Sequence, residues 1–226
     1  MKIGVLGTGT VGRTLAAGLA ELGHTVTLGT RDVAATLGRK PAEGSARVTL
    51  ADWHTKHPAI EILTFAQAAA GAELVINATS GGRSLDALEL AKPESLKGKI
   101  LIDVANPLVF AHGMPPTLFV KNTDSLAERI QRAYPDARVV KTLNTVSAAV
   151  IVDPASLGGG DHSIFLSGND AAAKTVVADL LRSFGWRDIV DLGDITTARG
   201  AEMLLPLWVR LFSALGTPKL NVKVVR

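Results

Sequence analysis

The chain has 226 residues, of which 47% are hydrophobic, 20% are charged and 4% are aromatic. This composition is typical of an ordinary globular protein, and the small net charge of +3, scattered along the chain, argues against nucleic acid as a partner. The sequence contains no cysteine, which excludes disulfides, thiol catalysis and thiolate metal sites.

The N-terminus and the apolar segments predict a cytoplasmic protein without a membrane partner. The chain begins directly with the apolar run of residues 2–6, which leaves no room for a signal peptide. The apolar run of residues 201–216 contains charges and a proline, so we expect it not to span a membrane.

Short apolar runs alternate with amphipathic stretches over residues 1–150. The runs that we predict as buried strands are residues 2–6, 25–29, 60–63, 73–79, 99–105 and 138–143. Helices are predicted over residues 11–23, 65–72, 84–96 and 125–135. Continuously apolar strands that alternate with helices are typical of a parallel sheet covered on both faces. We therefore predict an α/β fold of Rossmann type, doubly wound around a mainly parallel sheet.

Two segments interrupt this alternation. Residues 32–59 are polar and mixed, and we expect a short helix followed by an irregular excursion. Residues 107–123 contain three prolines and a glycine, which predicts a long loop. A long loop at the carboxyl end of a strand often lines a ligand site.

The glycine-rich stretch 153–162 predicts a boundary between a dinucleotide-binding part, residues 1–152, and a small α+β cap, residues 153–226. In the cap we expect strands over residues 163–168, 187–193 and 219–225, and helices over residues 170–185 and 197–215. Asn169 is the expected N-cap of the first helix, and Pro206 predicts a kink in the second. The apolar second helix, with Trp208 and Phe212, predicts a homodimer.

The sequence "GTGTVG" places Gly7, Gly9 and Gly12 at the spacing of a dinucleotide-binding loop, after a strand and at the start of a helix. Gly7 permits the tight turn, Gly9 lets the backbone approach a pyrophosphate, and Gly12 lets the helix pack on the strand. The free amide groups at the start of the helix favour an anion.

The residues after the second strand favour NADP over NAD. An NAD enzyme carries a carboxylate here that binds the ribose, whereas this chain has Thr30 and Arg31, which suit a 2′-phosphate. Arg39 and Lys40 lie nearby and add positive charge. In the alternative interpretation Asp32 binds the ribose of NAD, but it comes one or two residues late.

The chain resembles the NADPH-dependent reductases of the deazaflavin coenzyme F420. The resemblance runs through most of the chain and rests on five segments, "GTGTVGRTLAAGLAELGHTVTLGTRD" (7–32), "LIDVANPL" (101–108), "KTLNTVSAAVIVDP" (141–154), "FLSGNDAAAKTVVADLL" (165–181) and "TTARGAEMLLPL" (196–207). Three features differ from the family pattern: residues 33–59 are longer and more polar, no lysine follows Arg31 within a turn, and Asn144 replaces a histidine.

The resemblance implies a set of cofactor contacts. The pyrophosphate would be held by the glycine loop, namely Gly7, Thr8, Gly9, Thr10, Val11 and Gly12, and the 2′-phosphate by Thr30 and Arg31. The nicotinamide half would be framed by Thr79, Ser80, Gly81, Asn106, Pro107, Asn144, Thr145 and Ala148. Leu220 falls where the family touches the deazaflavin.

The implied function is hydride transfer between NADPH and coenzyme F420 or a similar planar acceptor. Such a reaction needs positioning and exclusion of water more than acid–base groups, so we predict no catalytic side chain of its own. Two alternatives remain open: reduction of another acceptor, such as a flavin, a quinone or an imine like pyrroline carboxylate, and a redox sensor that binds NADPH without turnover.

The remaining polar residues give weaker signals. His54 and His57 are spaced for a metal, but no carboxylate cluster lies nearby in sequence, so we predict no metal site. His112, in the proline-rich loop, is a candidate proton donor. Asp103 is expected to cap loop amides or to shape the nicotinamide site. Arg199 and Glu202 are spaced for a surface ion pair on one helix face, and a fixed salt bridge at the domain junction is the alternative.

Overall fold

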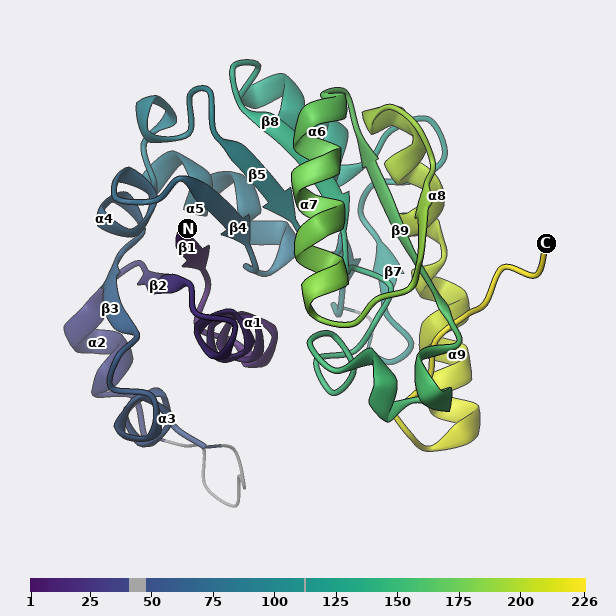
Figure 1. Ribbon diagram of the computed structural model, residues 1–226, viewed down its shortest axis with the longest axis horizontal. Helices are drawn as coiled ribbons and strands as arrows, with labels where there is room; N and C mark the ends of the chain where they lie inside the picture. Colours follow the sequence, from purple (N-terminus) through teal and green to yellow (C-terminus); the bar gives the residue numbers. More distant parts are fainter. Residues whose placement is uncertain (41–47, 112) are drawn as a thin grey trace.

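The computed structural model describes residues 1–40, 48–111 and 113–226, which build an eight-stranded sheet with helices on both faces (Figure 1). The strands of this sheet are β1 (Lys2–Leu6), β2 (Thr25–Thr30), β3 (Glu61–Thr64), β4 (Leu74–Asn77), β5 (Ile100–Asp103), β8 (Arg138–Thr142), β9 (Ser163–Gly168) and β10 (Asp188–Asp191). Their spatial order is β10-β9-β8-β5-β4-β1-β2-β3. Only the β8–β9 pair of this sheet is antiparallel, so the predicted Rossmann-type architecture is confirmed.

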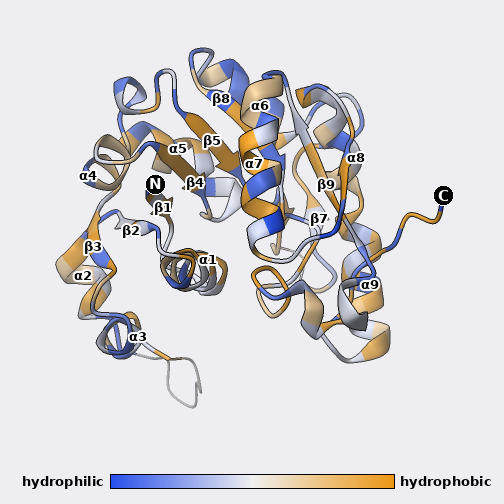
Figure 2. Ribbon diagram, viewed as in Figure 1, coloured by the Kyte–Doolittle hydropathy of each residue, from blue (hydrophilic) through white to orange (hydrophobic). Residues whose placement is uncertain are grey.

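The strands are buried on both faces because successive side chains enter two different cores. In β5, Ile100 and Ile102 pack into one core and Leu101 into the other. The first core is closed by α1 (Thr10–Glu21) and α7 (Ala171–Ser183). The second is closed by α4 (Phe65–Ala70), α5 (Ser84–Leu90) and α6 (Leu126–Ala133). Figure 2 shows the resulting contrast between hydrophobic β4 and β5 and the mixed surface of α7.

Local hydrogen bonds and prolines set the helix boundaries, and three of these differ from the sequence predictions. The helix predicted over residues 84–96 ends at Leu90 as α5, and a short 3₁₀ helix follows at Pro93–Ser95. Asp170, and not Asn169, caps α7, because its carboxylate accepts a hydrogen bond from Ala173 N while Asn169 accepts one from Ile195 N. The predicted helix over 197–215 is divided into α8 (Ala198–Met203) and α9 (Leu205–Leu215), with Pro206 in the first turn of α9.

The two interrupting segments contain short elements. The polar excursion forms α2 (Val33–Leu37) and α3 (Leu50–Lys56). The proline-rich loop contains a small antiparallel pair, β6 (Leu108–Val109) and β7 (Thr117–Leu118). His112, the candidate proton donor, lies outside the described residues.

The C-terminal part both extends the main sheet and adds a separate tail. β9 and β10 continue the sheet beyond β8, and the predicted division at residue 152 stays a prediction. The prediction of a strand over residues 219–225 is wrong. This segment forms a single main-chain hydrogen bond with β9, from Ser163 N to Val222 O, and does not pair with it as a strand. Side chains hold the tail instead: Asn221 donates to the buried His162 ring and to Ser163 O.

Candidate functional site

The glycine loop joins β1 to α1 and leaves room for an anion at the start of the helix. Gly7 has a φ of 119°, which favours glycine, and a Cβ on Gly12 would lie 2.0 Å from Gly7 O. A Cβ on Gly9 would meet no atom of the described residues within 4 Å, so this side of the loop is open. The N-cap of α1 is Gly9, which has no side chain to bond the first amide groups of the helix, and these amides therefore suit a pyrophosphate.

The end of β2 presents the exposed cation of Arg31, while hydrogen bonds within the protein engage Thr30 and Asp32 on either side of it. Thr36 donates its hydroxyl hydrogen to Asp32 O at 2.6 Å, so the 2.8 Å contact between Thr30 and Thr36 uses the hydrogen of Thr30. The Asp32 carboxylate accepts from Ala35 N at 2.8 Å and caps α2. Arg31 is exposed, which leaves its guanidinium as the hydrogen-bond donor for an anion at this end.

A small cavity of about 180 Å³ lies where the loops after β4 and β5 meet. Its lining is largely apolar, and consists of Val11, Ala78, Thr79, Ser80, Gly81, Val104, Ala105, Asn106, Leu108 and Phe110. The two loops touch closely, since a Cβ on Gly81 would lie 2.0 Å from Asn106 O. We call this cavity the nicotinamide pocket, after its predicted ligand.

Two buried polar atoms at or near the nicotinamide pocket have no hydrogen-bond partner among the described residues. Asn106 donates from Nδ2 to Asn144 O at 3.0 Å, which fixes the orientation of its amide group. Its Oδ1 is buried and has no partner in the described part of the chain, and neither has Oγ1 of Thr145. Leu143, just before Asn144, has a φ of 60°, a conformation that a leucine adopts rarely. Free buried acceptors and backbone strain are typical of a binding site.

A buried ionic cluster of Asp103, Lys141 and Glu202 lies directly behind this pocket. Lys141 donates to Asp103 Oδ2 at 2.7 Å, to Ala105 O at 2.5 Å and to Glu202 Oε1 at 3.0 Å. The side chains of Lys141 and Asp103 are wholly buried, and that of Glu202 is 2% exposed. Burial alone would lower the pKa of Lys141, but the charges and hydrogen bonds of Asp103 and Glu202 raise it above its ordinary value. The ammonium group is therefore charged at neutral pH.

The predicted ion pair between Arg199 and Glu202 is wrong, because each residue pairs with a different element. Arg199 binds Glu128 through two hydrogen bonds, at 2.5 and 2.9 Å. Glu202 joins the buried cluster and also accepts from Leu126 N and from Ala127 N, at the start of α6. The two residues thus attach α8 to α6 at two separate points.

The structure brings part of the predicted site together and leaves other members apart. Among the described residues lining the nicotinamide pocket, the predicted ones are Val11, Thr79, Ser80, Gly81 and Asn106. Pro107, Asn144, Thr145 and Ala148 do not line it, although Asn144 contacts it through Asn106. Leu220 is buried in the C-terminal tail and does not line it either. The cofactor role of each residue stays a prediction.

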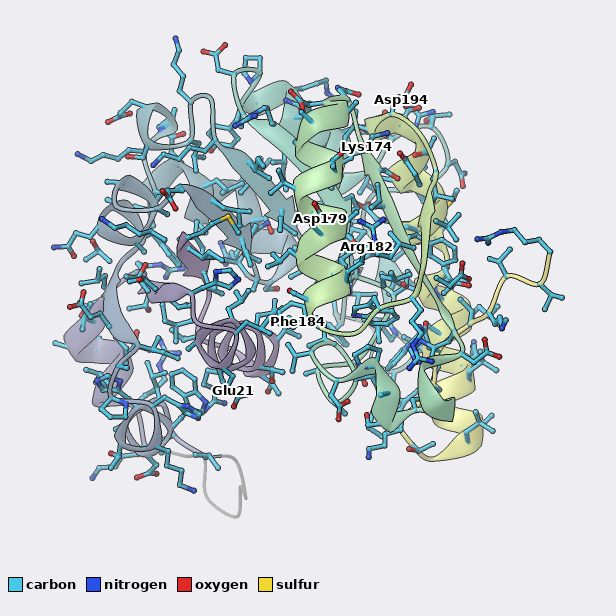
Figure 3. All side chains as sticks on the ribbon, in the orientation of Figure 1. Glu21, Lys174, Asp179, Arg182, Phe184 and Asp194 are labelled. Atoms are coloured by element: carbon cyan, nitrogen blue, oxygen red, sulfur yellow. The ribbon has the colours of Figure 1, made fainter. Side chains whose placement is uncertain are left out.

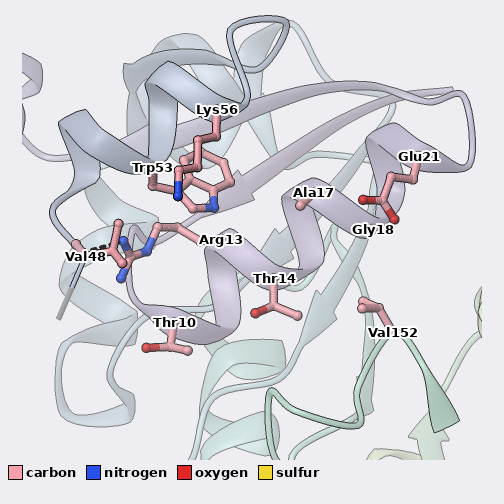
Figure 4. Close-up of a pocket in the computed structure, with 10 residues that line it drawn as sticks. All are labelled: Thr10, Arg13, Thr14, Ala17, Gly18, Glu21, Val48, Trp53, Lys56 and Val152. Carbon is pink, nitrogen blue, oxygen red and sulfur yellow. Dashed lines mark hydrogen bonds between the residues drawn. The ribbon is translucent and has the colours of Figure 1, made fainter. Parts of the chain in front are cut away.

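A larger cavity of about 500 Å³ runs along the outer side of α1 (Figure 4). Trp53 and Lys56 of α3 line one side of it, and Arg13 donates to the main-chain oxygens of Val48 and Thr49. The amide groups of α1 point out of the end of the helix and not from its side. The glycine loop, and not this cavity, therefore stays the predicted site of the dinucleotide.

No cluster of three or more histidine or acidic side chains suited to a metal ion occurs in residues 1–40, 48–111 and 113–226. His57 instead packs against Trp53, with ring centroids 4.5 Å apart. In the same ranges, no helix is long and apolar enough to cross a bilayer.

Lys141 was not among the residues that the sequence pattern predicted near the site. Its signal was a single lysine within the apolar strand of residues 138–143, where an unpaired charge would be very unfavourable. Its partners come from β5 and α8, which lie 38 and 61 residues away, so sequence spacing did not reveal them.

A doubly wound sheet whose first strand leads through an open glycine loop into a helix defines a dinucleotide-binding protein of Rossmann type. The family model described as "NADP oxidoreductase coenzyme F420-dependent" matches residues 2–107. An F420-dependent NADP reductase from Methanothermobacter marburgensis is 30% identical over 217 residues, which cover 93% of this chain and 92% of that protein. The chain therefore belongs to the family of coenzyme F420-dependent NADP oxidoreductases.

Other similarities vary in extent. Metalloreductase STEAP3 from Rattus norvegicus is 29% identical over 92% of this chain, and the chain spans 38% of its length. A solved structure from Arthrobacter sp. FB24, provisionally assigned as an F420-dependent NADP reductase, has a TM-score of 0.96 at 61% identity, covering 100% of both chains. A reductive aminase from Aspergillus terreus, with a TM-score of 0.62 at 19% identity over 94% of this chain and 62% of that chain, shares the fold alone.

Proposed function

We propose that this chain transfers a hydride between NADPH and a planar acceptor of the deazaflavin type, such as coenzyme F420. The observation that carries the proposal is the nicotinamide pocket, which continues from Val11 of the glycine-loop helix and has no ionisable side chain among its described lining residues. Hydride transfer requires alignment and exclusion of water and no charged group at the reacting carbon. A pocket of this composition meets that requirement.

The residues at both ends fit the parts of NADPH that they would hold. The open face at Gly9 and the uncapped start of α1 would hold the pyrophosphate, and the Arg31 guanidinium would hold the 2′-phosphate. Asn106, which lines the pocket, would lie beside the nicotinamide ring, and that ring supplies the hydride when the cofactor is bound. Phe110 is 59% exposed and also lines the pocket, so its ring is available to stack on a planar acceptor.

The proposal is tested by following the loss of NADPH absorbance with each acceptor in turn: coenzyme F420, a flavin, a quinone and pyrroline carboxylate. Oxidation with F420 alone supports the proposal. Oxidation with another acceptor alone reassigns the substrate, and tight binding of NADPH without turnover points to a sensor. Absence of NADPH binding overturns all of these functions.

We also propose that the chain forms a homodimer through α9. Leu207 and Leu215 of α9 are 53% and 61% exposed, and Trp208 stacks on Phe212 with its buried Nε1 unpartnered among the described residues. A second copy packed on α9 would cover these side chains. Sedimentation of the protein with Leu207→Glu and Leu215→Glu is expected to show monomers, whereas a wild-type monomer would contradict the prediction.

A further inference from the structure

The buried cluster of Asp103, Lys141 and Glu202 has no direct part in the proposed hydride transfer. All three hydrogens of the Lys141 ammonium group are used in hydrogen bonds, to two carboxylates and to Ala105 O. Because the group is saturated and wholly buried, it is not placed to exchange a proton with a ligand. Buried ions of this kind are often no more stabilising than apolar side chains of the same size, so their directional contacts are the better explanation for their presence.

Those contacts hold both walls of the nicotinamide pocket. The Asp103 carboxylate accepts from Asn77 Nδ2 at 2.8 Å and from Ala105 N at 3.2 Å. Asn77 in turn accepts from the Thr79 hydroxyl at 2.6 Å, and Thr79 lines the pocket on the side of β4. Lys141 holds Ala105 O on the side of β5, immediately before Asn106. One ion pair therefore fixes two loops that belong to different strands.

The same cluster connects the pocket to the C-terminal helices. Glu202 on α8 binds Lys141 and the first amides of α6. The neighbouring Ala201 O accepts from Asn144 Nδ2 at 3.1 Å, and Asn144 O accepts from Asn106 Nδ2. The position of α8 is thus transmitted to the pocket by two routes that begin at adjacent residues.

We propose that Lys141, together with Asp103 and Glu202, is a positioning residue that orients the nicotinamide pocket without touching the cofactor. The inference rests on the proposed function, since it takes the nicotinamide ring as the occupant of this pocket. Its consequence is that loss of the cluster impairs binding of the nicotinamide half of NADPH while leaving the adenosine half unaffected.

The test uses a variant in which all three charges are replaced together, with Asp103→Asn, Lys141→Met and Glu202→Gln. Joint replacement leaves no unpaired buried charge, so the fold is expected to survive. Two probes separate the ends of the site: NADPH, and adenosine 2′,5′-bisphosphate, which has the 2′-phosphate but no nicotinamide. We expect the affinity for NADPH to fall about tenfold, and that for the bisphosphate to change less than about twofold.

A second readout follows the ring itself. The fluorescence anisotropy of the reduced nicotinamide reports its immobilisation and needs no acceptor, and we expect it to fall in saturated complexes of the variant. The matched control replaces the pair that joins the same two helices elsewhere, with Arg199→Gln and Glu128→Gln, and is expected to leave both affinities and the anisotropy unchanged.

Three outcomes would overturn the inference: equal losses for both probes, no loss for either, or the same selective loss in the control. If the triple variant does not fold, the single Asp103→Asn variant, which keeps Lys141 paired with Glu202, decides by the same comparison. A wild-type protein that binds the bisphosphate but gains no affinity from the nicotinamide would instead contradict the proposed function.

Discussion

The two ends of the predicted dinucleotide site are built on opposite principles. At the end of β2 the exposed Arg31 lies beside a carboxylate, Asp32, that is engaged in capping α2. At the ends of β4, β5 and β8 the polar residues are buried, and Asn77, Asp103 and Lys141 are each at most 1% exposed. An anion can be bound by one exposed cation at the surface, but a reacting ring must be positioned by side chains that are themselves fixed by buried contacts.

The largest expected effect would show whether the buried end depends on its ion pair. Lys141→Met leaves the carboxylates of Asp103 and Glu202 buried without their cation, which is expected to lower the free energy of unfolding by about 3–5 kcal/mol. Urea denaturation measures this loss. The control is Arg182→Gln on α7, where the pair with Asp179 is exposed (Figure 3), and its expected change is within about 0.5 kcal/mol. A loss in Lys141→Met as small as that of the control would contradict the comparison.

The next effect concerns the exposed end. Arg31→Ala is expected to weaken NADPH binding by about 1.5–3 kcal/mol, the value of a charged hydrogen bond, and to leave NADH binding unchanged. Binding is measured by titration of each coenzyme. Asp32→Asn keeps the cap on α2 but removes the charge, and we expect it to leave the affinity for NADH unchanged. A marked loss of NADH affinity in Asp32→Asn would instead assign Asp32 to the ribose of NAD.

A smaller effect is expected between the two ends, at the glycine loop. A Cβ on Gly9 has open space within the protein but would project toward the expected pyrophosphate. Gly9→Ala is therefore predicted to fold normally and to bind NADPH about tenfold more weakly. Gly12→Ala, whose Cβ would meet Gly7 O at 2.0 Å, should lose stability as well. Melting temperature and titration on both variants separate the two effects, and full NADPH affinity in Gly9→Ala would refute the assignment.

The smallest expected effect is a pH dependence of the folding stability, caused by the partly exposed ion pair of Arg199 and Glu128. Burial would raise the pKa of the Glu128 carboxyl. Hydrogen bonds from Arg199 and Ser125, together with the charge of Arg199, hold this pKa below its ordinary value of 4.5. The folded carboxyl therefore binds its proton more weakly than the unfolded one, and this stabilisation is complete above that value and is lost as the pH falls through the lowered pKa. The stability difference between wild type and Arg199→Gln should shrink in acid, and a difference independent of pH would contradict this.

Local sequence signals were sufficient wherever one segment forms a feature by itself. The glycine loop needs only Gly7, Gly9 and Gly12 at the right spacing, and the parallel sheet needs only continuous apolar runs that alternate with helices. Local competition explains the error at α7, because Asn169 and Asp170 both suit an N-cap and the distant Ile195 N engages Asn169. The predicted terminal strand failed because an alternating apolar pattern does not specify whether a sheet edge will pair with it.

The sequence by itself determined the fold class, the glycine loop and the basic residue after the second strand, because each depends on neighbours in the chain. Only the tertiary structure decided that Arg199 and Glu202 have separate partners and that Asp103, Lys141 and Glu202 meet behind one pocket. These contacts join residues 38 to 71 positions apart. Buried charges are stable only when such partners converge from several elements, and the convergence follows from the packing of α8 against the sheet and α6.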